Sequence, residues 1–326
     1  MELLTNGMGL SVVVFFPLIS AFIITLIPKA QEQLIKGFAL VSSLITFVLS
    51  AVLLFQFDFS SADKLQLGNK ISWIKSINAN YEIGIDGISL PLLVLSTFIT
   101  VLAIIYSIEH LPEPKSPKGF LALILVLETG MNGTFVALDL ILFFVFFEIV
   151  LLPMYFMIGI WGDKTVRTVS GFKNQIETRL YASIKFFVFT LFGSAFMLLG
   201  FLGLYYRGNK TFSIPELIEL GTSGAFTGTF ATLVFAVLFL GFAVKVPMWP
   251  LHTWLPDAHT AAPTVGSVLL AAILLKLGSY GFVRIAIPIL PEQAKAWAPA
   301  IAILSAIGII YGSLACLAQT DLKRLI

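Results

Sequence analysis

The sequence predicts an all-α integral membrane protein with about nine to ten transmembrane helices. Of its 326 residues, 58% are hydrophobic and only 12% are charged, whereas soluble domains carry about 45–50% apolar and about 25% charged residues. Nine apolar segments reach the roughly 20 residues that a membrane-spanning helix needs. The connections between them are too short for a soluble domain, so we expect a single membrane domain over residues 1–326.

The nine apolar segments follow one another at short intervals: 8–27, 34–56, 88–108, 118–137, 140–160, 181–206, 226–246, 263–288 and 297–317. The longest connection, 57–87, contains KLQLGNKISW, in which apolar residues alternate around Gly68-Asn69. This alternation favours a β-hairpin with a two-residue turn, and an irregular loop is the alternative.

Composition and motifs exclude several classes of function. The net charge is +2 and the sequence holds no basic run, so we expect no nucleic acid partner. Cys316 is the single cysteine, which excludes an internal disulfide and a thiolate metal site. The sequence also lacks a Walker-type loop and a nucleophile elbow, and we therefore expect neither a metal nor a redox cofactor in this chain.

The basic residues of the loops favour one orientation. Loops after odd-numbered helices carry ten Lys and Arg residues, and loops after even-numbered helices carry seven. Because cytoplasmic loops are enriched in Lys and Arg, the sequence predicts a multi-pass protein of the cell inner (plasma) membrane with its N-terminus outside.

The stretch Val244–Gly278 places two lysines inside apolar sequence. Lys245 precedes Pro247 and Pro250, so its helix must distort just after it. Lys276 lies centrally in the next span and is expected to be buried. Freed carbonyls and a lysine at one level make a polar pocket, which a membrane tolerates only where it is buried in protein or lines water. The prolines and tryptophans between the two lysines predict a stiff re-entrant turn.

Two acids and a third lysine also lie within predicted spans. A charge at the centre of a bilayer costs about 2.5–3.5 kcal/mol or more. Glu148 lies near the middle of the fifth span, too far from either end to snorkel, and Glu128 in the fourth span is a secondary candidate. Lys185 lies near the start of the sixth span, where it either snorkels to the interface or takes part in function. Structural roles are the alternatives for these residues and for the lysines of Val244–Gly278.

These residue types permit proton transfer. Burial disfavours a charged lysine and a nearby carboxylate favours it, so moving or neutralising Glu148 would make a buried lysine release its proton. Our hypothesis is that Glu148 and Lys245 form a modulating ion pair and that Lys276 is the next proton carrier. His252 and His259 either relay protons, because histidine titrates near physiological pH, or hydrogen-bond the turn.

Five dispersed motifs carry a specific resemblance: YEIGIDGISLPL (Tyr81–Leu92), LILFFVFFEIVLLPMYFMIGIWG (Leu140–Gly162), RLYASIKFFVFTLFGSAFMLLG (Arg179–Gly200), the stretch Val244–Gly278 and QTDLKRLI (Gln319–Ile326). At these residues the chain resembles subunit M, the chain 4 type, of NADH-quinone oxidoreductase, or respiratory complex I. The resemblance covers essentially the whole chain. It departs from the family at Phe147, where the family usually has Trp.

The resemblance implies an antiporter-like inverted-repeat bundle with a broken seventh helix. By this resemblance Glu148 lies on the fifth helix, Lys245 on the broken seventh and Lys276 on the eighth, as proton-transfer residues. Residues 1–120 would form helices one to three, 118–288 the first repeat and 297–326 the incomplete start of the second, with Lys323 at its beginning. Because helices eleven to fourteen of the family are missing, we expect the chain to be C-terminally truncated.

The resemblance further implies a proton-translocating, non-redox membrane subunit of NADH:quinone oxidoreductase. Flavin, iron–sulfur clusters and the quinone site would belong to other subunits, with no cofactor in this chain. The implied partners are the L-, N- and K-type membrane subunits and the lipid bilayer. One alternative is a subunit of a multisubunit sodium/proton antiporter or a membrane-bound hydrogenase, which shares the Glu and Lys positions. The second alternative is a structural membrane subunit without transport.

Overall fold

The computed structural model describes residues 7–167 and 175–325, so that the last residue of the Gln319–Ile326 motif lies outside the described part. Within these residues, nine helices are long and apolar enough to span a membrane, which confirms the predicted fold class and the nine spans. The largest difference is in the ninth helix, which begins at Pro291 rather than at 297. Proline and the acidic Glu292 both suit the first turn of a helix, and they extend it beyond its apolar part.

The residues cluster into two compact units, which are described separately. The first unit comprises the residues up to Met157 together with Ala271–Ile273, and the second comprises Ile158–Leu270 and the residues from Leu274 onward. The subdivision predicted from the resemblance, with limits at 118, 288 and 297, stays a prediction.

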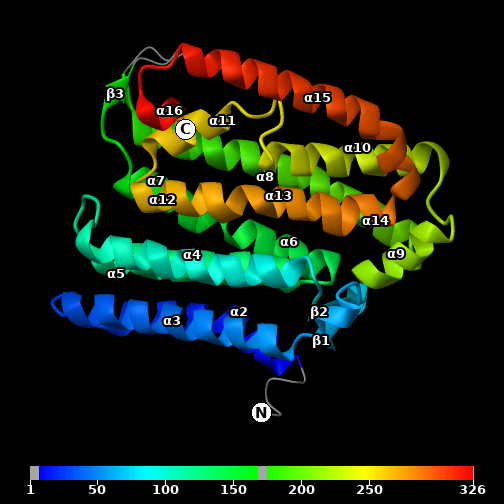
Figure 1. The fold of residues 1–326 in the computed structure, drawn as a ribbon, viewed down its shortest axis with the longest axis horizontal. Coiled ribbons are helices and arrows are strands. Elements are labelled where there is room, and N and C mark those ends of the chain that lie inside the picture. Colours follow the sequence, from blue (N-terminus) through cyan, green and yellow to red (C-terminus); the bar gives the residue numbers. More distant parts are fainter. Residues whose placement is uncertain (1–6, 168–174, 326) are drawn as a thin grey trace. The chain divides into compact units, whose positions relative to one another are not determined.

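The first unit is built around a bundle of four helices that lie side by side, as Figure 1 shows: α2 (Met8–Leu26), α3 (Glu32–Gln56), α4 (Ser89–Glu109) and α5 (Pro117–Val136). Hydroxyl side chains occupy contacts between them: the hydroxyls of Ser50 and Thr97 lie 2.7 Å apart, and Ser96 Oγ donates to Asn132 Oδ1 at 2.9 Å. Small polar residues allow membrane helices to approach closely. The unit also contains α6 (Leu140–Ile149) and the start of α7 (Leu151–Trp161).

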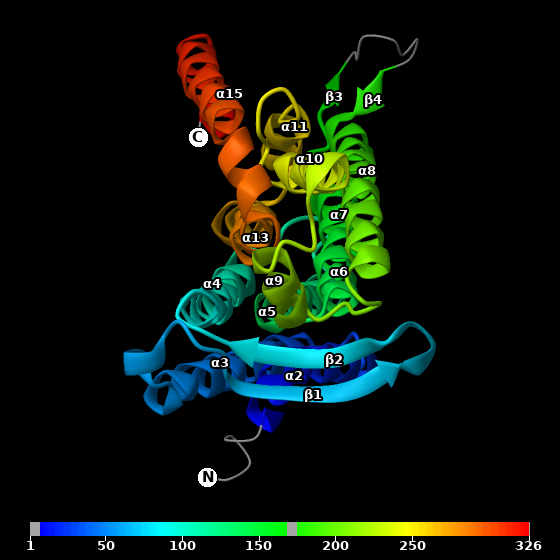
Figure 2. The same ribbon diagram turned by 90° about the vertical axis from the view of Figure 1, so that its right-hand side faces the viewer.

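A β-hairpin lies between α3 and α4 in the sequence (Figure 2). Strand β1 (Gln66–Ile74) pairs antiparallel with β2 (Ala79–Ile85), which confirms the predicted hairpin. The predicted turn at Gly68-Asn69 is wrong, because the chain turns at Lys75–Ile77 and Asn78, whose φ of 53° suits asparagine. Gly68 instead lies inside β1, where an added Cβ would come within 3.0 Å of a backbone oxygen of β2.

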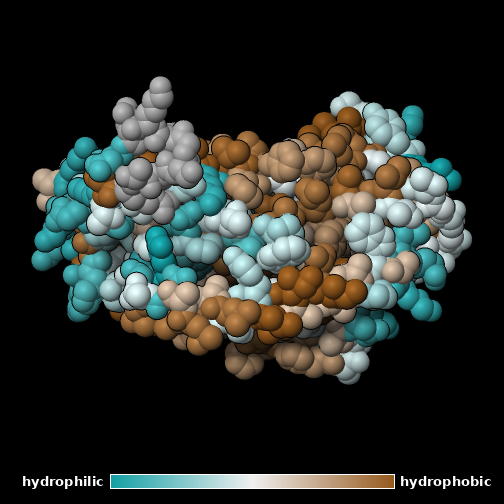
Figure 3. All heavy atoms as spheres, turned by 90° about the horizontal axis from the view of Figure 1, so that it is seen from above, coloured by the Kyte–Doolittle hydropathy of each residue, from teal (hydrophilic) through white to brown (hydrophobic). Residues whose placement is uncertain are grey.

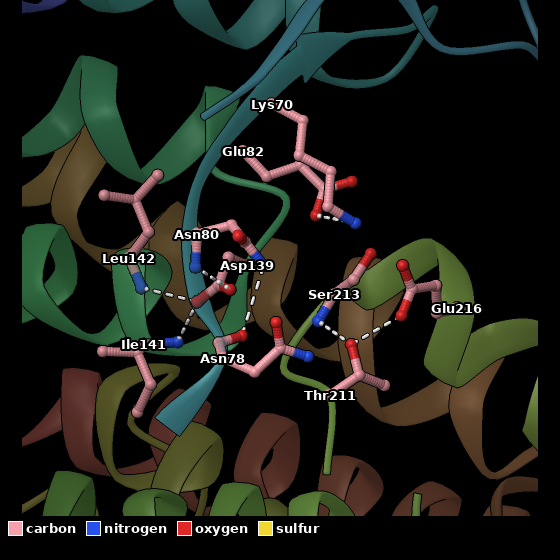
Figure 4. Close-up of polar contacts among 10 residues, drawn as sticks. All are labelled: Lys70, Asn78, Asn80, Glu82, Asp139, Ile141, Leu142, Thr211, Ser213 and Glu216. Atoms are coloured by element: carbon pink, nitrogen blue, oxygen red, sulfur yellow. Dashed lines mark hydrogen bonds and ion pairs between the residues drawn. The ribbon is translucent and has the colours of Figure 1, made fainter. Parts of the chain in front are cut away.

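Asp139 ties this hairpin to the start of α6 (Figure 4). Its buried carboxylate accepts the N–H of Asn80 at 2.9 Å through Oδ2 and those of Ile141 and Leu142 at 2.9 and 3.2 Å through Oδ1. The second pair of bonds caps the N-terminus of α6. Burial raises the pKa of Asp139, and the three N–H donors act against that rise. The helix that carries Glu148 therefore begins at a fixed point.

Replacing Asp139 by alanine is expected to lower the free energy of unfolding by about 1–3 kcal/mol. The change removes the cap of α6 and leaves the buried N–H of Asn80 without its acceptor. Thermal unfolding in detergent measures the loss. Asp58→Ala is the matched control, since Asp58 caps an exposed turn through Ser60. An equal loss in both variants would contradict the anchoring role of Asp139.

In the second unit, α8 and α10 pack along one another (Figure 2). Glycines of α8 allow this approach, since a Cβ at Gly200 would lie 2.6 Å from the side chain of Leu238. The elements of the unit are β3 (Val166–Arg167), β4 (Ile176–Glu177), α8 (Thr178–Arg207), α9 (Ile214–Thr222), α10 (Gly228–Lys245), α11 (Trp254–Ala261), α12 (Thr264–Leu269), α13 (Leu275–Gly281), α14 (Ile287–Ile289), α15 (Pro291–Leu317) and α16 (Leu322–Leu325).

The structure adds two features that were not predicted from the sequence. The eighth span, Thr264–Ile289, contains π-helical turns at Leu270–Leu274 and Phe282–Ala286. The short helix α9 was not predicted. The Thr211 hydroxyl fixes its start, because it donates to Glu216 at 2.6 Å and accepts the N–H of Ser213 at 3.1 Å (Figure 4).

The surface of the chain matches a membrane environment. On the face shown in Figure 3, hydrophobic residues form a central band and hydrophilic residues gather at both ends. In the second unit, α8 contributes exposed apolar residues such as Val188 and Phe192, and α15 contributes Ile309 and Ile310. The chain is therefore a multi-pass membrane protein.

Candidate functional site

The end of α10 is broken in a way that the prolines of the next segment dictate. Pro247 has no N–H, so the Ala243 carbonyl, its usual partner in a helix, accepts Met248 N–H at 2.9 Å instead. This diverts Met248 from the Val244 carbonyl, and the indole Nε1–H of Trp254 takes that place at 2.9 Å. The predicted stiff turn thus contains the short helix α11, whose first residue completes the broken end of α10.

Lys245 is the last residue of α10 and lies at this break. Its side chain is only 3% exposed, as the sequence predicted. The backbone of α13 approaches it closely, because a Cβ at Gly278 would lie 3.0 Å from Lys245 Cβ and 2.9 Å from the side chain of Val246. A lysine is therefore held in the interior of the second unit, directly beside an interrupted helix, where proton-transfer residues of transporters are found.

Trp254→Phe is expected to lower the free energy of unfolding by about 1–3 kcal/mol. Phenylalanine keeps a ring that can pack against Phe186, whose ring centre lies 5.5 Å away, but it leaves the buried carbonyl of Val244 without its donor. Chemical denaturation in detergent measures the loss. Trp297→Phe is the control, since Trp297 contacts Phe235 and Phe239 only through its ring, and a loss as large there would contradict the role of the indole N–H.

An ion pair joins α8 to α11. Lys185 Nζ lies 2.8 Å from Asp257 Oδ2, and the two side chains are 20% and 19% exposed. Lys185 also lies over the ring of Tyr181, 5.6 Å from its centre. The structure therefore gives Lys185 a partner in the second unit.

A cavity of about 420 Å³ opens beside this pair. His252 lines it, with its ring 5.3 Å from that of Tyr311, and its Nδ1 is buried and has no hydrogen-bond partner within the described residues. Burial lowers the pKa of His252, and the charge of Lys185 lowers it further. The polar residues that line the cavity with His252 are Asp257, Tyr311, Gln319 and Arg324.

His259 and Lys323 lie at the other end of α11. Burial lowers the pKa of His259 to about 4, with a further contribution from the charge of Lys323. Lys323 Nζ donates to the Ala262 carbonyl at 2.6 Å, so this cation occupies the C-terminus of α11, where the helix dipole favours it. His259 is therefore neutral at physiological pH.

Lys276 differs from Lys245. Its side chain is exposed in the described chain, so the expected burial of Lys276 is wrong. The exposed positions of the eighth span recur every three to five residues, which places them along one outer face: Thr264, Val268, Ala271, Lys276, Ser279, Val283 and Ile287. A central position in the sequence does not determine which face of a helix a residue occupies.

The two acids lie in the first unit. Glu148 is partly buried near the end of α6, and its Oε1 is inaccessible to solvent. Glu128 on α5 is completely buried, and neither of its carboxyl oxygens has a hydrogen-bond partner within the described residues. The structure thus separates the candidates by unit, with the acids in the first and the lysines and histidines in the second.

Asp257 was not predicted as a site residue, although it pairs with Lys185 at a separation of 72 residues. A lone carboxylate in an apolar chain needs a cation, and this need was a usable signal. Tyr311 and Arg324 of the cavity carried no signal, because their place depends on how α15 and α16 pack.

Comparison with protein families gives two adjoining matches. The model described as NADH:quinone oxidoreductase/Mrp antiporter, TM, matches residues 137–326, and the model described as NADH-ubiquinone oxidoreductase chain 4, amino terminus, matches residues 12–134. The chain is 40% identical to NADH-quinone oxidoreductase subunit M of Rickettsia bellii, over 97% of this chain and 61% of that protein, and 41% identical to subunit M of Rhodobacter capsulatus, over 97% and 60%.

The fold is similar to that of a solved complex. A chain of respiratory complex I from Thermus thermophilus with bound NADH matches with a TM-score of 0.80 at 26% identity, over 97% of this chain and 61% of that one. The predicted resemblance and the antiporter-like fold are confirmed, and the chain spans about 60% of the length of the relatives that it matches. This chain therefore belongs to the family of membrane subunits that NADH:quinone oxidoreductases and Mrp antiporters share.

Proposed function

We propose that this chain is a proton-translocating membrane subunit, of the M or chain 4 type, of an NADH-quinone oxidoreductase. It contributes no redox centre and couples quinone reduction in other subunits to proton transport. The proposal depends on one observation above all: Lys245 is buried at the break between α10 and α11. Similarity to subunit M of two bacteria supports the type.

Lys245 is the central proton-transfer residue in this proposal, and Lys276 is the next carrier. Glu148 modulates the proton affinity of Lys245. A change of three units in the pKa of a lysine corresponds to about 4 kcal/mol, which a conformational change can supply. His252 and His259 take part as neutral relays beside Lys185 and Lys323.

The exposure of Lys276 supports action within a larger assembly. A charged lysine that faces lipid costs about 2.5–3.5 kcal/mol, and the exposed face of α13 would be covered by protein in the membrane. We propose the L-, N- and K-type subunits of the complex as the neighbours of this chain. The plasma membrane, with the N-terminus outside, is the proposed location.

Proton uptake by proteoliposomes that contain the assembled complex tests this function. With NADH and quinone supplied, Lys276→Ala is expected to lower the number of protons moved per electron, while electron transfer in uncoupled vesicles continues. Lys295→Ala is the control, because Lys295 lies exposed at the start of α15. An unchanged proton ratio in Lys276→Ala would favour a structural subunit, and a sodium-dependent flux without NADH would favour an antiporter.

A further inference from the structure

Glu128 is an acid that the arrangement around Lys245 does not use. It lies in the middle of α5 with none of its surface exposed, and neither carboxyl oxygen has a hydrogen-bond partner within the described residues. A buried polar group without a partner costs about 1–3 kcal/mol, and a charged one costs more. A leucine at this position would stabilise the bundle, so the fold alone gives no reason for the acid.

Within the first unit, the cations of the described elements packed on α5 are distant from Glu128. Among the described residues of the elements packed on α5 in the first unit, α2 has no charged side chain, α3 carries Glu32 and Lys36, α4 ends at Glu109, α6 carries Glu148, and β2 carries Glu82. Lys36 donates to the Ile108 carbonyl at the far end of α4. Lys118, on α5 itself, donates to the Ile27 carbonyl and lies about 15 Å from Glu128 along the helix. None of these described residues therefore brings a cation beside the Glu128 carboxyl.

A polar contact between α4 and α5 begins beside Glu128. Ser96 Oγ donates to Asn132 Oδ1 at 2.9 Å, and the two helices run antiparallel through a short connection. One turn along each helix, at the four-residue spacing of helix neighbours, lie Glu128 on α5 and Thr100 on α4, whose hydroxyl donates to the Ser96 carbonyl. All four side chains are completely buried.

This polar contact has a direction. Toward the ends of α4 and α5 that adjoin the β1–β2 hairpin, the turn next to Glu128 holds Asn132 and Ser96, and Asn132 Nδ2 also lies 3.5 Å from the Val13 carbonyl of α2. Toward the opposite ends, the next turn holds the buried, apolar Leu125 and Ala103. Amides and hydroxyls can hydrogen-bond an ordered water that carries a proton, whereas the side chains of leucine and alanine cannot.

We propose that Glu128 is a separate proton-binding site of the first unit, which exchanges its proton along the Asn132–Ser96 contact with the hairpin ends of α4 and α5. Its ligand is a single proton on the carboxyl group. Any share of Glu128 in transport rests on the proposed function, whereas binding and exchange of the proton do not.

Infrared difference spectroscopy of the assembled complex at neutral pH tests the site. The wild type minus Glu128→Gln difference is expected to contain the carbonyl stretch of a protonated carboxyl group, which Glu128→Asp retains at a shifted frequency. If the band is absent from the wild type minus Glu128→Gln difference and no shifted band appears for Glu128→Asp, the proposal is overturned. The Asp variant preserves the test if the Gln variant does not assemble.

Exchange into deuterated water tests the route. With Glu128 in place, Asn132→Leu is expected to slow the deuterium shift of the band at least about tenfold, equivalent to 1.4 kcal/mol. Thr129→Val is the matched control, because the hydroxyl of Thr129 donates to its own helix at Leu125 and should leave the rate unchanged. Equal rates in Asn132→Leu and the wild type would overturn the route.

The two proposals fail separately. If the Glu128 band is absent but Lys276→Ala still lowers the number of protons moved per electron, only this inference is overturned. A band and an exchange rate as described, with a proton ratio that Lys276→Ala leaves unchanged, would overturn only the proposed function.

Discussion

Replacing Lys245 by methionine is expected to abolish proton transport by the assembled complex and to leave its fold intact. Methionine fills a similar volume at the end of α10 but cannot bind a proton, and removing an acid–base group slows proton transfer about 10²- to 10⁴-fold. Methionine also keeps the apolar packing of the lysine side chain, so the variant should still fold. Proton uptake by proteoliposomes and thermal unfolding measure the two effects.

Lys295→Met is the control for this variant, since it removes a lysine of the same size from an exposed position. It should keep proton transport. If Lys245→Met pumps as well as Lys295→Met does, Lys245 is not a proton-transfer residue, and the central element of the proposed function fails.

Lys185→Met is expected to lower the free energy of unfolding by about 3 kcal/mol, because it removes the cation that lies 2.8 Å from the largely buried carboxylate of Asp257. The double variant Lys185→Met/Asp257→Leu should recover most of this loss, since it removes both charges together. The pKa of His252 should rise in Lys185→Met, because the positive charge of Lys185 lowers it in the wild type. Denaturation in detergent and histidine NMR measure these changes.

An exposed pair provides the control. Lys115 and Glu113 lie 3.9 Å apart with 75% and 65% of their side chains exposed, so Lys115→Met should change stability by less than about 1 kcal/mol. A double variant that is no more stable than Lys185→Met would show that the loss comes from packing and not from an unpaired charge.

The spans could be predicted from the sequence because the bilayer imposes a length of apolar helix. The same holds for the break after Lys245, since Pro247 acts on its own helix within four residues. Both features depend on residues that are close together in the chain, and the structure reproduces both.

The remaining features depend on packing between distant segments. Lys276 is exposed because it lies on the outer face of α13, and Asp257 pairs with Lys185 of another helix. The hairpin turns at Asn78 and not at Gly68-Asn69, and Gly68 lies inside β1 against the backbone of β2. A local pattern cannot contain this information.

The break after α10 also constrains which substitutions the chain can accept. Pro247→Ala alone would restore an N–H for the Ala243 carbonyl, return Met248 to Val244, and leave the indole N–H of Trp254 without an acceptor. Trp254→Leu alone would remove the indole N–H that donates to the Val244 carbonyl. Each change is costly while the other residue stays, so the two positions are coupled. Sequence drift at either position is therefore restricted, and a continuous helix can be reached from this sequence only by changing both.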